Sequence, residues 1–390
     1  MNGRVTPAHA PRPRDVLGVP VLPPVAATRA ANLARSWLAR LHRALAPPPA
    51  RIMEAALAGL EPAVVAALCH LGVPDRLTRP VAVDELARAL HVDLQRLERL
   101  LRFAHVRGVV RLDRRGRVRS TRLTRFLRSD HPGGWVAWPM FVASASVHAA
   151  IGGLPDGLTD DTDAFTVANG QPFFPWLADH PEDGARFDAA MAAGARLHGL
   201  LLARVLDLSG RERVCDIGGG DGTLLETLIA HHRHLEGVVL ELPEVAARMP
   251  ARHRVVAKAG DAFTAVPPGF DTYLLVNVLH DWDDEVATRL LARAADAARA
   301  TSRAGPAPQI IVVDGEARPR PTDDITLLAD TLMLTLTPGG RERTLEAFTD
   351  LGRSAGLDLS DHHRLASGDV ALVFAVAGAA ASHRTPSRSA

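Results

Sequence analysis

The chain has 390 residues, of which 47% are hydrophobic, and its 45 basic and 44 acidic residues leave a net charge of +1. This composition provides a core large enough for two or three domains and excludes a disordered chain. The charge balance excludes a global attraction to nucleic acid or to an anionic membrane.

The N-terminus and the cysteines indicate a cytoplasmic protein. Arg12 and Arg14 precede a stretch that Pro20 interrupts, which argues against a secretory signal peptide. No apolar run approaches the ~18–20 residues of a membrane span, so no membrane contact is expected. Cys69 and Cys215 lie far apart, which excludes a disulfide framework or zinc-ligand spacing and fits a reducing compartment.

The first segments in chain order are a leader and two helices. Residues 1–24 are rich in Pro and Arg and lack periodicity, which predicts a disordered leader. A helical pattern over residues 25–45 ends at the prolines of residues 47–49, which cannot continue a helix. Apolar residues then recur at helical spacing over residues 51–71.

A winged-helix pattern follows these helices. Asp93 caps a helix, and two short strands are expected over residues 109–112 and 118–120. More helices fill residues 135–206. The sequence therefore predicts a mainly helical domain with a winged helix over residues 25–205.

The texture of the sequence changes beyond residue 205, where buried-strand runs alternate with helical segments. The expected strands lie at residues 214–217, 238–242, 255–257, 272–278 and 310–314. Such alternation predicts an α/β domain with a parallel sheet over residues 206–380, followed by a disordered tail at residues 381–390.

A glycine-rich loop between the first strand and its helix is the first candidate site. It reads Asp-Ile-Gly-Gly-Gly-Asp-Gly at residues 216–222, and such glycines let the backbone approach a ligand closely. The dinucleotide fingerprint fails at Thr223. Asp216 suits a positively charged ligand, such as a sulfonium with an amino group, because it would repel a pyrophosphate.

The next two strand ends also carry carboxylates. Glu241 follows the second strand, where α/β folds bind ribose hydroxyls. Asp261 follows the third and can reach an adenine edge, with Ala262 and Phe263 beside it. The alternative is an ordinary glycine turn with acidic helix caps, but three strand ends in register favour a nucleoside site.

His280 is delivered to the same sheet edge by the fourth strand. Histidine titrates near neutral pH and can act as a general base. Asp314, after the fifth strand, and Glu342 are candidate carboxylates for orienting its ring. A purely structural histidine is the alternative, and the position at a strand's carboxyl end favours function.

These stretches together resemble the class-I methyltransferases, specifically the caffeate- and hydroxyindole-type small-molecule O-methyltransferases, with bacterial antibiotic-tailoring members looking most similar. The resemblance covers residues 50–378. It is carried by the glycine loop, Pro-Phe-Phe-Pro-Trp-Leu at 172–177, Phe-Asp-Ala-Ala-Met at 187–191, Leu-His-Asp-Trp-Asp-Asp at 279–284 and Gly-Gly-Arg-Glu-Arg-Thr at 339–344.

The resemblance implies a Rossmann-like methyltransferase domain behind a helical domain that dimerises and covers the substrate, and hence a homodimer. It implies S-adenosylmethionine as cofactor, S-adenosylhomocysteine as product and no metal. A hydroxyl of a small aromatic or polyketide-type metabolite would accept the methyl group, with His280 as base. The implied catalytic set is His280, Asp314 and Glu342, and the implied cofactor set is Asp216, Gly218, Gly220, Glu241, Asp261, Ala262, Phe263 and Trp282.

The chain departs from the family pattern at several positions. Glu241 stands where Asp is usual, and Ala262 is smaller than the common residue. Asp314 is shorter than the Glu of plant members, so Glu316 competes with it as the carboxylate beside His280.

Candidate acceptor contacts are apolar or acidic residues of the helical segments, and the apolar ones favour a planar substrate, although they fit a protein core equally well. They are Phe173, Trp176, Met191, Asp281, Asp330 and Met333.

Three other functions remain as alternatives. Relatives of this fold catalyse hydroxylation or decarboxylation, and nitrogen could be the acceptor. A winged-helix DNA-binding regulator is the third, because residues 107–128 hold nine arginines against Asp113. The apolar series on the preceding helix suits packing better than base contacts, so nucleic acid is not expected as a partner.

Overall fold

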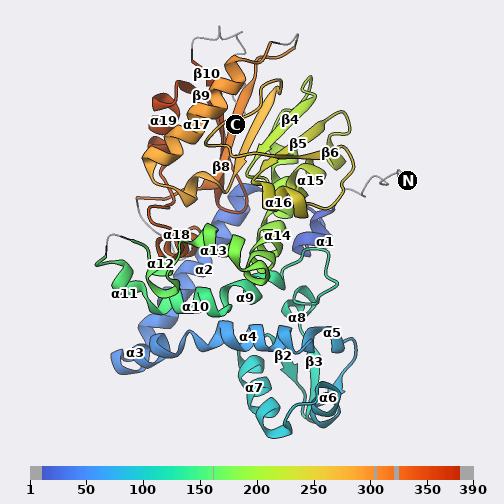
Figure 1. Ribbon diagram of the computed structural model, residues 1–390. Helices are drawn as coiled ribbons and strands as arrows, with labels where there is room; N and C mark the ends of the chain where they lie inside the picture. The colour runs from blue at the N-terminus through green and yellow to red at the C-terminus, as the bar shows by residue number, and fades with distance from the viewer. Residues whose placement is uncertain (1–10, 161, 303–304, 320–324, 378–390) are drawn as a thin grey trace.

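The structure is a computed structural model that describes residues 11–160, 162–302, 305–319 and 325–377. A helical part and an α/β part are joined by one long helix, α14 (Pro181–Val205) (Figure 1). This helix contacts both α9 (Ala137–Val142) and α15 (Thr223–His231). Gly199 permits the close approach of α14 to α15, because a Cβ atom there would lie 2.6 Å from the Thr227 Cβ atom.

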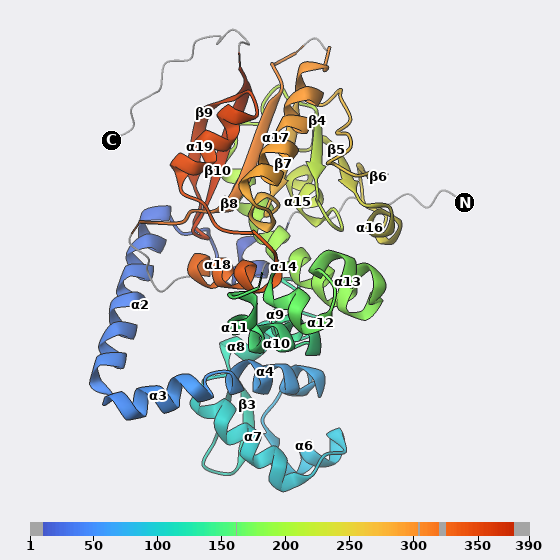
Figure 2. The ribbon, with the colours of Figure 1, turned by 60° about the vertical axis from the view of Figure 1, so that its left-hand side comes forward.

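The N-terminal segment forms α1 (Pro13–Leu17), α2 (Val25–Leu45) and α3 (Pro48–Leu57). The prediction of a disordered leader is wrong for residues 11–24, since α1 packs on α14 and Val16 is fully buried. The Trp135 indole donates to the Val16 carbonyl at 2.7 Å. Residues 1–10 lie outside the described residues. Helices α2 and α3 stand away from the rest of the chain (Figure 2).

The predicted winged helix is present, with a three-stranded antiparallel sheet in the order β1-β3-β2. As expected, Asp93 caps its helix by accepting from the Arg96 backbone N–H at 2.8 Å. The elements are α4 (Leu60–His70), α5 (Val73–Arg76), β1 (Val81–Ala82), α6 (Val83–Leu90), α7 (Leu94–Val106), β2 (Val110–Leu112), β3 (Arg117–Ser120) and α8 (Arg122–Phe126).

The apolar stretch formed by α3 and α4 differs from the sequence prediction. Residues 48–70 make a helical stretch of 23 residues that is long and apolar enough to cross a membrane by length and composition, whereas no such run was expected. One such stretch is weak evidence for a span. The α4 half packs against α7 and α9, and Leu68 is 1% exposed.

Short helices above the winged helix surround an aromatic core that includes Phe141, Phe165 and Phe173. Packing of these rings against α14 joins the helices into one layer. The helices are α9, α10 (Ala145–Gly152), α11 (Leu154–Gly157), α12 (Ala164–Asn169) and α13 (Phe173–Asp179).

The α/β part is a seven-stranded sheet in the order β6-β5-β4-β7-β8-β10-β9. Its strands are β4 (Arg213–Ile217), β5 (Glu236–Glu241), β6 (Val255–Ala259), β7 (Thr272–Val276), β8 (Gln309–Gly315), β9 (Leu357–Arg364) and β10 (Asp369–Val376). The first five are parallel, which confirms the predicted α/β class. The sequence analysis did not predict β9 and β10, of which β10 pairs antiparallel with both β8 and β9.

Helices cover both faces of the sheet, so its strands are apolar on both sides. One face packs against α17 (Asp284–Arg299) and α19 (Leu345–Ser354), and the other against α14 and α15. Two further helices, α16 (Pro243–Arg248) and α18 (Ile325–Leu336), flank the carboxyl edge. The predicted tail at residues 381–390 lies outside the described residues.

Candidate active site

The glycine loop follows β4 and holds a buried carboxylate beneath it. Asp216 is 1% exposed, and within the described chain its Oδ2 atom has no hydrogen-bond partner. Gly218, Gly220 and Gly222 have φ angles of 70°, 57° and 78°, which L side chains rarely adopt. Burial, reinforced by the charge of Glu241, raises the pKa of Asp216 to about 8. An unpartnered acid below a flexible cradle fits a cationic group of a ligand.

Glu241 ends β5, the strand beside β4, and Asp261 follows β6, the next strand outward in the sheet. Glu241 accepts hydrogen bonds from the backbone N–H of Gly220 at 3.1 Å and of Leu242 at 2.9 Å, which ties the loop to the second strand end. Burial raises its pKa despite these bonds. Asp261 accepts from the Phe263 N–H at 2.9 Å and orders its own turn. The three predicted carboxylates therefore share one sheet edge.

An aromatic group closes this edge. The rings of Phe263 and Trp282 meet edge to face with centroids 5.0 Å apart, and Ala262 is half-buried beside them. Trp282 also stacks on Phe174 of α13 at 5.7 Å. Sequence reasoning did not single out Phe174, whose contact with Trp282 connects the helical part to the cofactor side of the sheet.

His280 lies in a short 3₁₀ helix, η1 (Leu279–Asp281), directly after β7. Its Nδ1 atom is 3.1 Å from the Glu342 Oε1 atom and 3.9 Å from the Asp314 Oδ1 atom. Its Nε2 atom lies 3.7 Å from the Asp281 Oδ1 atom. Glu316 instead binds Arg364 through both of its oxygens, at 2.7 and 2.8 Å. Of the two competing carboxylates, Asp314 is the one beside the histidine.

The electrostatics of this cluster favour a protonated imidazole. Burial lowers the pKa of His280, but the charge of Asp281 and the hydrogen bond to Glu342 outweigh it and raise that pKa to about 10. Burial also raises the pKa of Asp281 to about 6 and that of Asp314 well above its ordinary value. Both Asp314 oxygens lack a hydrogen-bond partner within the described residues. The cluster is thus built to accept and share a proton.

Arg343 and Gly315 support the histidine, and sequence reasoning missed both. The Arg343 guanidinium, only 1% exposed, donates to the carbonyls of Leu279 at 2.8 Å and Trp282 at 2.6 Å, and so holds the segment that carries His280. A Cβ atom on Gly315 would lie 2.6 Å from the Glu342 carboxylate. The conspicuous Gly-Gly-Arg-Glu-Arg-Thr stretch was the available signal for Arg343.

The candidate acceptor contacts separate into two groups. Phe173 is 4% exposed inside the aromatic core, and Trp176 stacks on His180 and donates to Asp183 at 3.0 Å, so both are held by internal packing. The others lie on α14, η1 and α18: Met191, Asp281, Asp330 and Met333. Asp330 accepts from the Glu342 backbone N–H at 2.8 Å, which links α18 to the histidine cluster.

The geometry favours neither a metal site nor phosphate binding by the arginines of residues 107–128. Within the described residues no group of three or more His, Cys, Asp or Glu could hold a metal ion. In the arginine-rich wing, Asp113 binds Arg117 and Arg119, at 3.0 and 3.1 Å. Part of that positive charge is therefore neutralised locally.

Comparison with protein families gives two matches. Residues 53–130 match the O-methyltransferase dimerisation domain, and residues 152–358 match the O-methyltransferase domain. The second match covers the glycine loop, His280 and Glu342.

Individual relatives agree with the family matches. The mitomycin biosynthesis 6-O-methyltransferase of Streptomyces lavendulae is 34% identical over 78% of this chain and 87% of its own length. The structure of the mitomycin 7-O-methyltransferase MmcR is 27% identical, with a TM-score of 0.76 over 84% of this chain and 98% of that one. The O-methyltransferase NcsB1, solved with S-adenosylmethionine and 2-hydroxy-5-methyl naphthoic acid, is 28% identical, with a TM-score of 0.66 over 81% and 96%.

Two relatives are named for other chemistry. Aclacinomycin 10-hydroxylase RdmB of Streptomyces purpurascens is 33% identical over 72% of this chain and 76% of its own length. An 8-amino-8-demethylriboflavin N,N-dimethyltransferase of Streptomyces davaonensis is 31% identical over 81% and 92%. The family matches and the first relatives nevertheless agree on one chemistry. This chain belongs to the O-methyltransferase family and is an S-adenosylmethionine-dependent O-methyltransferase with an N-terminal dimerisation domain.

Proposed function

We propose that the enzyme methylates a phenolic hydroxyl of a small aromatic or polyketide-type metabolite in antibiotic biosynthesis, with His280 as general base. The observation that carries the proposal is the His280–Glu342 contact of 3.1 Å, at the same sheet edge as Asp216, whose Oδ2 atom has no partner among the described residues. The mitomycin and naphthoic acid named for the relatives support a polycyclic or bicyclic acceptor.

S-adenosylmethionine, when bound, supplies a methyl group already activated by its sulfonium. The residues of this edge fit it: Asp216 would hold the amino group, Glu241 the ribose hydroxyls and Asp261 the adenine. What the chain must add is orientation of the acceptor oxygen and removal of its proton. His280 takes that proton on Nε2, while Glu342 on the Nδ1 side and Asp314 behind it stabilise the imidazolium that forms.

The raised pKa of His280 sets the pH at which it can act as a base. A base must be neutral before it acts, and the three carboxylates favour the charged imidazole that exists after proton transfer. A protonated Asp314, favoured by its burial, reduces the negative charge around the resting histidine. The equilibrium between these forms makes activity rise with pH until His280 is neutral.

Hydroxylation and N-methylation are the competing chemistries, as two relatives are named for them. An amine acceptor needs less assistance from a base than a phenol does, and a hydroxylase needs an oxidant. Retention of a histidine held by Glu342 supports proton removal from oxygen. A deprotonation-independent reaction would leave this arrangement without a use.

Transfer of labelled methyl from S-adenosylmethionine to a panel of hydroxynaphthoates, hydroxyquinones and aminophenols tests the proposal. We expect an O-methyl product, and His280→Gln should reduce turnover at least 100-fold with binding of S-adenosylhomocysteine unchanged. His231→Gln is the matched control, since that ring bonds the Thr227 carbonyl within α15, away from the His280 cluster. Full activity of His280→Gln, or methylation of nitrogen alone, would refute the proposal.

We further propose that the N-terminal helices form a homodimer. The arm, defined as α2 and α3, carries large apolar side chains that are more than half exposed, which monomers rarely gather in one place. They include Trp37, Leu38, Leu45, Ile52, Met53 and Leu57. The arm runs directly into the matched dimerisation domain, so a second copy is the partner that its surface fits.

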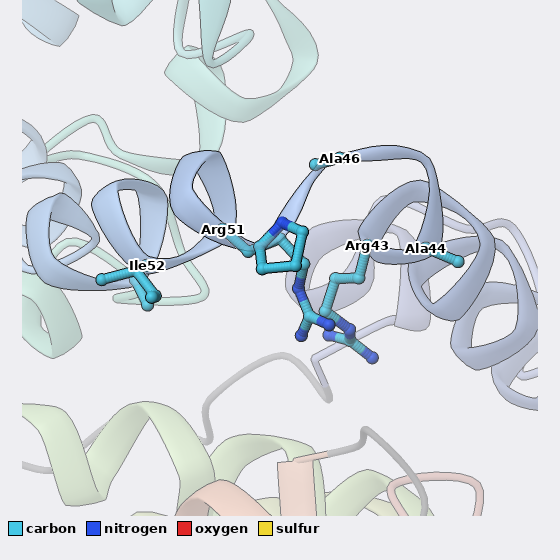
Figure 3. Close-up of a pocket in the computed structure, with 7 residues that line it drawn as sticks. Arg43, Ala44, Ala46, Arg51 and Ile52 are labelled. Atoms are coloured by element: carbon cyan, nitrogen blue, oxygen red, sulfur yellow. The ribbon is translucent and has the colours of Figure 1, made fainter.

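The apolar surface of the arm is hollowed at the junction between α2 and α3. A hollow of about 560 Å³ lies there, lined by Ala44, Ala46 and Ile52 together with Arg43 and Arg51, whose side chains extend in the same direction (Figure 3). Sedimentation should show a dimer in the wild type and a monomer in Trp37→Glu/Leu45→Glu. A monomeric wild type at micromolar concentration would contradict the proposal.

The two unpaired cysteines, Cys69 and Cys215, support a cytoplasmic location, which we also propose. The direct check is to fuse the full chain to a reporter that is active only inside the cytoplasm and, separately, to one that is active only outside it. A reporter active only outside the cytoplasm would overturn this assignment.

A further inference from the structure

Arg252, in the loop between α16 and β6, has a side chain that is 10% exposed, and its guanidinium bonds the glycine loop and the start of α15. Its Nε atom donates to the Asp221 carbonyl at 2.6 Å, and its Nη2 atom donates to the Asp221 carboxylate at 2.6 Å and to the Thr223 hydroxyl at 2.8 Å. Its Nη1 atom donates to the Glu226 carboxylate on α15. One guanidinium thus connects the glycine loop, the first residue of α15 and that helix's first turn.

The glycine loop needs such an external contact. Residues 218–222 read Gly-Gly-Gly-Asp-Gly, and glycine has the largest conformational freedom in the chain. Asp221 carries the one side chain of that stretch, and Arg252 binds both its backbone and its carboxylate. A rigid planar donor that makes several bonds at once fixes orientation in a way that a lysine cannot.

Burying the Arg252 guanidinium at the N-terminus of α15 costs free energy in two ways. A buried cation loses hydration, and the N-terminus of a helix disfavours positive charge. Asp221 and Glu226 supply two carboxylates to this cation and so offset both costs. A Cβ atom at Gly222 would lie 3.3 Å from both the Met249 Sδ and the Arg252 Cδ atom, so these two side chains pack closely against that side of the loop.

We propose that Arg252 is a positioning residue for the cofactor: it holds the glycine loop in the conformation that binds S-adenosylmethionine and its product. It touches neither the reacting atoms nor His280. Its loss therefore weakens cofactor binding and leaves methyl transfer at saturating cofactor nearly unchanged.

Calorimetric titration of the full-length protein with S-adenosylhomocysteine tests this proposal, together with amide hydrogen exchange of the ligand-free protein. Arg252→Met should raise the Kd at least tenfold and accelerate exchange over residues 218–224, and Arg252→Lys should fall between it and the wild type. The KM for S-adenosylmethionine should rise in parallel, with kcat within about threefold of wild type. Arg254→Met is the matched control, because that side chain contacts Glu236 and the Arg233 carbonyl, away from the loop.

An unchanged Kd for a folded Arg252→Met protein overturns the proposal, and so does a lower kcat with an unchanged Kd. If Arg252→Met does not fold, Asp221→Asn and Glu226→Gln replace it, since each removes one charge of the network and keeps its shape. Weaker binding in both, with the exchange of the loop accelerated, supports the network. Wild-type binding in both overturns it.

Discussion

Replacing Asp216 with Asn should stabilise the ligand-free enzyme while weakening its cofactor binding. Burial and the charge of Glu241 raise the pKa of Asp216 from 3.8 to about 8. The folded state therefore holds this proton more tightly than the unfolded state does, and stability falls as pH rises from about 4 to about 8. By linkage, the lost stability reaches about 4 kcal/mol at pH 7.

An asparagine avoids this cost because it does not ionise. Its amide lacks partners in the same place, which costs about 1–3 kcal/mol. The net gain at pH 7 is then about 1–3 kcal/mol, or a rise in Tm of several degrees at about 2–4 °C per kcal/mol. Loss of the charge-assisted bond to the cofactor's amino group, about 1.5–3 kcal/mol, should weaken S-adenosylhomocysteine binding about 10- to 100-fold.

Thermal unfolding at pH 4.5 and pH 7, without and with S-adenosylhomocysteine, measures both effects on one protein. The stability of Asp216→Asn relative to wild type should fall by about 3 kcal/mol at the lower pH, so that the variant is then no more stable than wild type, because wild-type Asp216 is protonated in the folded state. Asp296→Asn on α17, whose carboxylate pairs with Arg299 at the surface, is the control. A variant that is less stable than wild type at pH 7, or that binds the product equally well, would refute the reasoning.

Three further substitutions probe the histidine cluster. Gly315→Ala should lower kcat at least tenfold without changing cofactor affinity, because its Cβ atom would meet the Glu342 carboxylate 2.6 Å away. Gly194→Ala is the kinetic control, because the space around its Cβ position is open. This control should keep the wild-type kcat and should be neutral or more stable by about 0.5–1 kcal/mol. Glu342→Gln should retain cofactor binding and shift the rise of the pH–rate profile to lower pH, because one carboxylate that raises the His280 pKa is lost. An unshifted profile would show that Glu342 does not act on His280. Arg343→Met should destabilise the fold by about 1–3 kcal/mol, because the carbonyls of Leu279 and Trp282 lose a buried donor, while Asp284 keeps its contact with Arg341. Urea unfolding with an unchanged midpoint would contradict this.

The elements that local patterns specify were predictable from sequence. Parallel strands with apolar residues on both faces are recognisable in the sequence as short apolar runs. Because the carboxyl ends of such strands share an edge of the sheet, the sequence predicts that four side chains lie near that edge: Asp216, Glu241, Asp261 and His280. The outcome for Asp314 against Glu316 required the structure. The two positions lie only two residues apart at the end of β8, and what separates them is a distant partner, because Arg364, 48 residues later, pairs with Glu316.

The features that the sequence did not reveal are those that depend on contacts between distant residues. Arg252 acts on a loop about 30 residues earlier, and Arg343 acts on a segment about 60 residues earlier. No periodic pattern encodes such pairings. Residues 11–24 were misassigned for the same reason, because their burial depends on Trp135 and α14 rather than on their own composition.

The position of β10 in the sheet has a consequence for biosynthesis of the chain. Although β10 is the last strand of the described residues, it lies inside the sheet, with β8 on one side and β9 on the other. While the ribosome still covers the final residues, β8 therefore presents an open row of backbone donors and acceptors to the cell, which is a template for mispairing with other chains. A nonsense mutation before residue 369 would make that exposure permanent. Truncated products of this gene should accordingly aggregate rather than persist as folded, inactive enzymes.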